Sequence, residues 1–195
     1  MDYQILSFGQ DSNAVDILCL DSPIEKGLAG YAKSSLFPAN VGLVVDITPS
    51  EILEYDYACL AHYRNNDSYM VHMEASIFNG IKANDPMSLT TLFHELGHYV
   101  NRDLEDKALY SSEYEDERSA SILNGKANER ELAADRFAAM ILGNDIVVKG
   151  LEALKLNSLQ HYVEGEDDPE LLNLNQLELQ YRIEVLSIDN KGNWS

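Results

Sequence analysis

SLTTLFHELGHYVNRD, residues 88–103, places two histidines four positions apart, with a glutamate directly after the first. Four residues make slightly more than one helical turn, so His94 and His98 would lie on the same side of a helix. The apolar side chains of this stretch gather on a different stripe, which would face a core: Leu89, Leu92, Leu96, Tyr99 and Val100, with Phe93 beside them. The two histidines are therefore predicted to face a cleft.

The pattern of residues 94–98, HExxH, is typical of the metal-binding helix of zinc peptidases. In that pattern both histidines bind the ion, and the glutamate, here Glu95, acts on a water molecule bound to it. Asp85 and Pro86 precede the motif as a plausible helix cap and first helical residue. Since HExxH also arises by chance, a third ligand is needed to support the interpretation.

A second helix, predicted over residues 127–143, offers that ligand. Glu131 and Asp135 are four residues apart on a helix whose remaining surface is mostly apolar. Burying an unpaired carboxylate is costly, so metal ligation or a hydrogen bond to a metal-bound imidazole would explain both acids. The alternative places them at a solvated helix edge, paired with Arg130 or Arg136.

HELGHYV (94–100) together with ERELAADRFAAMIL (129–142) resembles the ImmA/IrrE family of metallopeptidases. The family pattern is HELGH followed by ExxADxFAaxLL. The resemblance covers residues 88–142 and extends more weakly to LELQYRIEVLSI (177–188), which is similar to the family's closing helix. The sequence departs from the family directly after the second helix, where ILGND stands in place of LLMP.

The resemblance implies a Zn²⁺ ion held by His94, His98 and Glu131, with Asp135 orienting one histidine. Such an ion lowers the pKa of its bound water to about 7 and polarises a peptide carbonyl. Glu95 would take the proton from that water and pass it to the leaving amine. A His/His/Glu site also accepts other divalent ions, so manganese or iron stays open.

A peptidase also needs a group that stabilises the oxyanion of the reaction. His161 and Tyr162 are candidates for this oxyanion stabiliser because they lie downstream of the third ligand. The competing interpretation is that each is an ordinary residue of a helix surface or core.

Residues 1–85 have the pattern of strands and loops, and helices follow. The expected strands cover residues 3–8, 14–20, 41–47, 57–63 and 68–78, with breaks at 22–30 and 35–40. Residues 47–55 could form a helix capped near Thr48 or Ser50. The acidic residues 103–117 are expected to form a solvated loop or frayed helix, and further helices are expected over 147–156 and 172–187.

This order predicts one α+β domain over residues 1–195, a minimal zincin-like metallopeptidase domain. A small N-terminal sheet, from residues 1–85, would pack on the HExxH helix. Residues 86–143 would form the zinc-site helices, and residues 144–195 a C-terminal helical part.

The chain has 33 acidic against 14 basic side chains, a formal net charge of -19. So acidic a surface repels phosphate backbones and attracts basic partners, which argues against direct nucleic-acid binding. Cys19 and Cys59 form no CxxC pair, so a zinc ribbon is excluded. The N-terminal segment lacks signal-peptide features, and no apolar run approaches the roughly 20 residues that cross a bilayer. A soluble, cytoplasmic protein is expected.

These features favour a cytoplasmic zinc endopeptidase. The resemblance implies limited proteolysis of a basic, DNA-binding helix-turn-helix repressor from a phage, a mobile element or a stress regulon. One alternative is a non-enzymatic acidic binding protein, an anti-repressor or DNA mimic with a structural zinc. Another is a broad-specificity gluzincin peptidase. Glu95 favours an enzyme, because a structural zinc site has no use for a general base.

Overall fold

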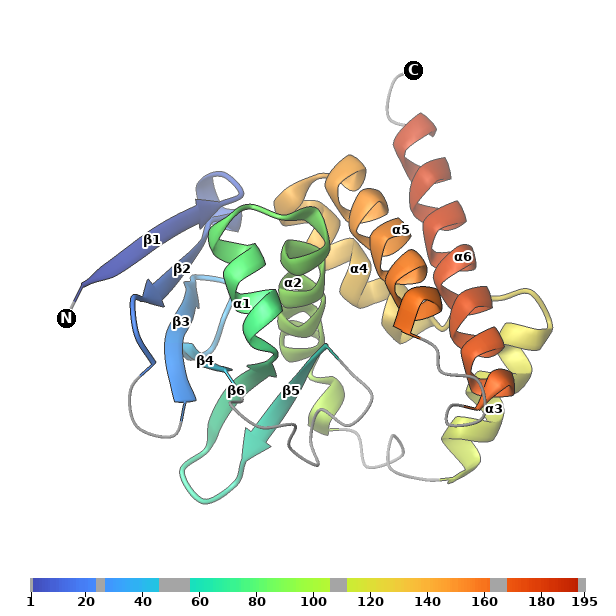
Figure 1. Cartoon of the computed structure of the whole chain (residues 1–195), viewed down its shortest axis with the longest axis horizontal. Helices are drawn as coiled ribbons and strands as arrows, with labels where there is room; N and C mark the ends of the chain where they lie inside the picture. The colour runs from blue at the N-terminus through green and yellow to red at the C-terminus, as the bar shows by residue number, and fades with distance from the viewer. Residues whose placement is uncertain (1, 24–26, 46–56, 106–111, 162–167, 193–195) are drawn as a thin grey trace.

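The computed structural model describes residues 2–23, 27–45, 57–105, 112–161 and 168–192, and the side chains of 112–117, 161 and 189–192 lie outside that description. Six strands come first and six helices follow within these residues, which confirms the predicted α+β class. The sheet and the C-terminal helices lie on opposite sides of helix α2, which runs between them (Figure 1).

The strands form one mixed sheet in the order β1-β2-β3-β4-β6-β5. Neighbours are antiparallel except β4 and β6, which are parallel. Strands β1 and β5 are therefore the two edges of the sheet. The bounds are β1 Tyr3–Phe8, β2 Val15–Leu20, β3 Leu28–Ser34, β4 Val41–Val45, β5 Ala58–Tyr63 and β6 Ser68–Met73.

The helices follow the sheet in the chain, and short 3-10 turns occur at Asp11–Asn13 and Asp103–Glu105. Helices α2 and α4 pack closely, and α5 covers a further side of α2. The bounds are α1 Ala75–Lys82, α2 Pro86–Asn101, α3 Ser112–Leu123, α4 Glu129–Leu142, α5 Asn144–His161 and α6 Pro169–Gly192.

Three expectations from the sequence were wrong. Strand β3 occupies part of the expected break at residues 22–30. Gly30 has a low propensity for strands, and its presence therefore favours a break in the sequence pattern. The structure requires glycine there, because any side chain would collide with the Leu18 carbonyl of β2. The expected strand over 68–78 ends at Met73, and a helix begins at Ala75 whose apolar residues are buried at helical spacing. The second half of the acidic segment, from Ser112, is the regular helix α3. The helix expected near Thr48 lies outside the described residues.

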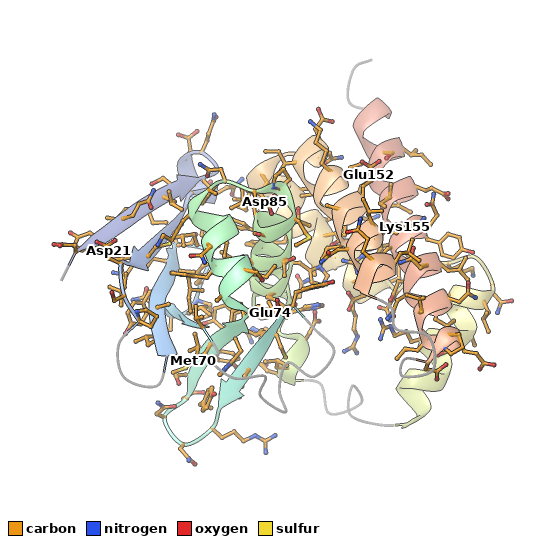
Figure 2. The ribbon with its side chains drawn as sticks, viewed as in Figure 1. Asp21, Met70, Glu74, Asp85, Glu152 and Lys155 are labelled. Carbon is orange, nitrogen blue, oxygen red and sulfur yellow. The ribbon has the colours of Figure 1, made fainter. Side chains whose placement is uncertain are left out.

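Helix α2 is the centre of the core. Leu92, Phe93 and Leu96 are fully buried, so the predicted apolar stripe faces inward. The helix begins where expected: the Asp85 carboxylate accepts hydrogen bonds from the Ser88 amide at 2.9 Å and the Ser88 hydroxyl at 2.8 Å (Figure 2). These bonds fix the residue at which α2 begins.

Gly97 allows α2 and α4 to approach each other closely. A Cβ atom at this position would lie 2.7 Å from the Cα of Ala134, which is backbone that cannot rotate away. Gly97 therefore has a packing role. The close approach places the side chains of α4 next to the histidines of α2.

We expect Gly97→Ala to destabilise the fold by about 1–3 kcal/mol, because the added methyl group must push α4 away. Helix propensity alone predicts the opposite, a gain of about 1 kcal/mol. Thermal and urea unfolding of both proteins would measure the difference. Asn101→Ala, at an exposed position of the same helix, is the control. A Gly97→Ala protein as stable as the wild type would contradict the close contact.

Candidate metal centre

Three side chains converge between α2 and α4. His94 and His98 project from α2, and Glu131 from the first turn of α4; one ligand atom of each lies within 4.8 Å of the others. The Nε2 atoms of the histidines are 3.0 Å apart, and Glu131 oxygens lie 3.1 Å from His94 Nε2 and 3.7 Å from His98 Nε2.

These spacings fit a tetrahedral divalent ion. With metal–ligand bonds of about 2.0–2.1 Å, neighbouring ligand atoms of a tetrahedron lie roughly 3.3 Å apart. Two imidazoles and one carboxylate are also the donor types that zinc accepts in catalytic sites, which keep a fourth position for water. The His94, His98 and Glu131 group could therefore hold a metal ion.

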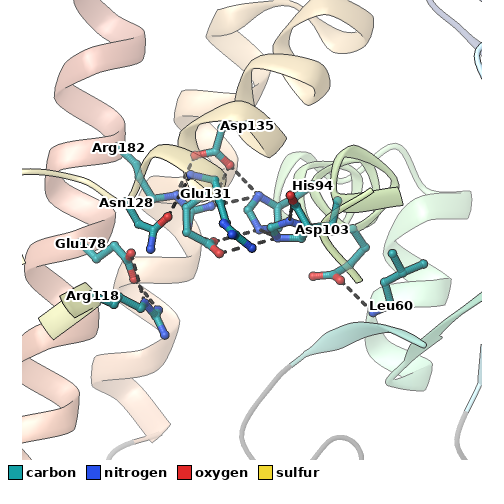
Figure 3. Close-up of polar contacts among 12 residues, drawn as sticks. Leu60, His94, Asp103, Arg118, Asn128, Glu131, Asp135, Glu178 and Arg182 are labelled. Carbon is teal, nitrogen blue, oxygen red and sulfur yellow. Dashed lines mark hydrogen bonds and ion pairs between the residues drawn. The ribbon is translucent and has the colours of Figure 1, made fainter. Parts of the chain in front are cut away.

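Each imidazole is oriented by a carboxylate on its far side (Figure 3). His94 Nδ1 lies 2.8 Å from Asp135 Oδ1, and His98 Nδ1 lies 2.7 Å from Asp103 Oδ2. Since a carboxylate only accepts, each Nδ1 carries a proton, and each Nε2 is the ring atom that faces the other ligands. Arg182 Nη2 is also 3.2 Å from His94 Nδ1. Two donors cannot share a hydrogen bond, so the shorter contact with Asp135 determines the tautomer.

Arg182 of α6 links the two acids of α4. Its Nε and Nη2 donate to the two oxygens of Asp135 at 2.6 and 2.7 Å, and its Nη1 donates to Glu131 Oε2 at 3.2 Å. Both Asp135 and Arg182 are buried. These hydrogen bonds from the Arg182 guanidinium hold both carboxylates in fixed orientations beside the imidazoles. Asp135 is therefore not at a solvated helix edge.

Sequence reasoning missed Asp103 and Arg182. Arg182 has a readable signal, because it lies within the helical stripe that Leu179, Ile183 and Leu186 form, where a charge needs a buried partner. The sequence signal for Asp103 is weaker. Asp103 reaches His98 because Arg102 takes a left-handed conformation, with a φ of 60°, and turns the chain back at the end of α2.

Glu95 lies beside the ligands and accepts a hydrogen bond from the Leu60 amide of β5 at 2.8 Å. It lines the same pocket of about 370 Å³ as His94, His98 and Glu131. Burial raises the pKa of Glu95, although the two histidines and the Leu60 amide oppose that rise. A carboxylate with a raised pKa is a better proton acceptor near neutral pH.

In the metal-free chain, His94 and Glu131 form an ion pair. Burial and Arg182 lower the pKa of His94, but Glu131 and the hydrogen bonds with Asp135 and Glu131 outweigh them and raise it to about 10. Burial acts to raise the pKa of Glu131, whereas His94 and Arg182 hold it well below its usual value. A metal ion must therefore displace a proton from His94.

The two predicted oxyanion residues are not placed by the structure. His161 is the last residue of α5, and its side chain lies outside the described residues, as does all of Tyr162. Their predicted role stays a prediction.

Comparisons of the chain with family models, with curated proteins and with solved structures give no match. The resemblance of residues 88–142 to the ImmA/IrrE family therefore stays a prediction from the sequence motifs. None of the described helices has the length and apolar character needed to cross a membrane.

We expect the metal affinity to rise with pH by up to about tenfold per pH unit below the raised pKa of His94. The sign follows from competition: His94 keeps its proton below a pKa of about 10, and the ion must remove it. Zinc titrations at about pH 7 and about pH 8, in buffers of different ionisation enthalpy, would count the released protons. Equal affinity at both pH values, without proton release, would contradict the ion pair.

We expect Arg182→Met to destabilise the protein by about 3–5 kcal/mol, because it leaves the buried Asp135 carboxylate unpaired. Zinc affinity should fall as well, since Glu131 and His94 lose the groups that orient them. Denaturant unfolding and zinc titration measure the two effects. Arg136→Met, which removes an exposed charge of α4, is the matched control. If the two variants were equally stable, the ion pair between Arg182 and Asp135 would not stabilise the fold as we expect.

Proposed function

We propose that this chain is a zinc-dependent endopeptidase. The observation that favours this function most is the position of Glu95, a carboxylate in the pocket of the His94, His98 and Glu131 group, held by the Leu60 amide. A structural zinc site has four protein ligands and no need of a general base. A base beside a three-ligand group supports hydrolysis.

In the proposed reaction, a bound zinc ion would lower the pKa of a water molecule to about 7 and polarise a peptide carbonyl. Glu95 takes a proton from the attacking water as its oxygen bonds to the carbonyl carbon. It then gives this proton to the amine nitrogen as the carbon–nitrogen bond breaks. Asp103 and Asp135 hold the tautomers of the two histidines throughout.

The sheet edge next to the pocket supports a polypeptide substrate. Strand β5 is an edge strand, and Tyr57 and Ala58 line the pocket. The Tyr57 carbonyl accepts a hydrogen bond from the backbone amide of Glu74, directly after β6. Backbone groups of successive strand residues point to alternate sides, so those of Ala58 and Leu60 point away from β6. An extended peptide that pairs with this edge would lie beside the metal ligands.

The charge of the chain supports a basic substrate. A net charge of -19 steers cationic partners toward the protein and repels nucleic acid itself. We therefore propose limited proteolysis of a basic DNA-binding regulator, a helix-turn-helix repressor of a phage, a mobile element or a stress regulon, as the sequence resemblance implies.

We expect Glu95→Gln to lower peptide hydrolysis by at least about 10²-fold while zinc content stays unchanged, because the base is removed and the ligands are kept. The measurement is a survey of new protein N-termini in cells that express either protein. One terminus in a basic regulator, found only with the wild type, would support a dedicated protease. Many such termini would favour a broad-specificity peptidase. Indistinguishable proteomes, together with wild-type protein that is inactive on peptides, would favour the non-enzymatic binding protein.

A further inference from the structure

Tyr57 lines the pocket of the metal ligands directly before β5. Its phenolic oxygen accepts a hydrogen bond from Asn157 Nδ2 of α5 at 2.8 Å. Among the described residues, no acceptor takes the proton of the Tyr57 hydroxyl. The hydroxyl is therefore fixed in position by one bond and still able to donate another.

The other hydroxyl groups of the pocket wall are less available. Thr91 donates to the Met87 carbonyl at 2.9 Å, and Ser158 donates to the Lys155 carbonyl at 3.1 Å. The Thr90 hydroxyl is buried without a partner, but it packs against α5, where it occupies the place that a side chain at Gly150 would need.

Both cations of the pocket wall are held by acids. Arg182 donates to Asp135 and Glu131, and Arg118 donates to Glu178 at 2.5 Å. Arg118 and Glu178 lie on the opposite side of Glu131 from Leu60 (Figure 3), and the Leu60 amide donates to Glu95. Moving either guanidinium toward a substrate would leave a buried carboxylate with less compensation, which is costly.

Asn175 of α6 is the remaining donor of the pocket wall. No hydrogen bond orients its amide within the described part of the chain. Tyr57 differs because the Asn157 bond fixes its oxygen and polarises its O–H group. Burial raises the pKa of Tyr57, with a smaller rise from Glu74 and a partial opposing effect of Asn157, so the phenol keeps its proton. Preorganised hydrogen-bond donors of this kind stabilise a developing oxyanion.

We propose that Tyr57 is a catalytic residue that donates a hydrogen bond to the oxyanion of the tetrahedral intermediate. This inference rests on the proposed peptidase function. When the water oxygen bonds to the carbonyl carbon, the electron pair of the C=O double bond moves to the carbonyl oxygen. The Tyr57 hydroxyl donates to this oxygen and retains its own proton. The bond is released when C=O re-forms and the amine leaves with the proton held by Glu95.

Tyr57 lines the same pocket as His94 and Glu95. The pocket volume of about 370 Å³ lies at the small end of ligand pockets. Tyr57 lies three residues before Leu60, whose amide orients Glu95. One short segment of chain would thus position the general base and the oxyanion donor.

The test is Tyr57→Phe, which removes the hydroxyl and keeps the ring. We expect kcat to fall about 10²- to 10³-fold, with KM and zinc content little changed, because the lost bond forms only in the transition state. A second readout avoids turnover. A phosphinic peptide, whose tetrahedral oxygens imitate the oxyanion, should bind the variant more weakly by a similar factor. A substrate peptide bound to the Glu95→Gln protein should keep its affinity when Tyr57→Phe is added.

Two further variants make the result decisive. Asn157→Ala, which keeps Tyr57 but removes its orienting bond, should lower kcat by a smaller factor than Tyr57→Phe, and Asn175→Ala should also lower kcat by less than Tyr57→Phe does. Tyr57 would lose the assignment if Tyr57→Phe kept the wild-type kcat and phosphinic-peptide affinity, or if Asn175→Ala produced the loss. The proposed function itself would be refuted if the wild type cleaved no peptide, or if the Glu95→Gln protein cleaved peptides as well as the wild type does.

Discussion

The buried positive charge of Arg182 is the constraint on which the metal centre depends. It comes from α6, close to the C-terminal end of the described chain, and bonds both acids of α4, Asp135 and Glu131. A cluster of carboxylates between packed helices would repel itself and would lose hydration without this cation. The orientation of Asp135 and Glu131 therefore depends on the packing of α6 against α4.

The other side of the pocket depends on the sheet. The Leu60 amide fixes Glu95, and the same strand begins next to Tyr57. The residues that could hold a metal ion thus belong to the helices, whereas the groups that would handle protons and developing charge are set by β5. Among the described residues β5 pairs only with β6, so this part of the site is an edge of the sheet.

Sequence patterns predicted the two helices that hold the ligands because their signals are local. The Asp85 cap, the apolar stripe of α2 and the composition of α4 all act within a few turns. The same local reasoning failed at β3, where Gly30 is required by a neighbouring strand and offers no strand signal of its own. It also missed the start of α1, since Ile77 and Phe78 suit a strand and a buried helix face equally. Asp103, Arg182 and Tyr57 reach the site through tertiary packing, which a single sequence does not display.

The hydrogen bond between Leu60 and Glu95 also limits how an incoming chain can align. A strand that adds to the outer edge of β5 would ordinarily accept from the outward amides of both Ala58 and Leu60. The Leu60 amide is already occupied by the Glu95 carboxylate. The added strand would therefore lack a backbone hydrogen bond to Leu60. This missing bond would lie beside the Glu95 carboxylate, which would receive the proton. The Leu60–Glu95 hydrogen bond, which orients the Glu95 side chain, would thereby also set the register of the added strand.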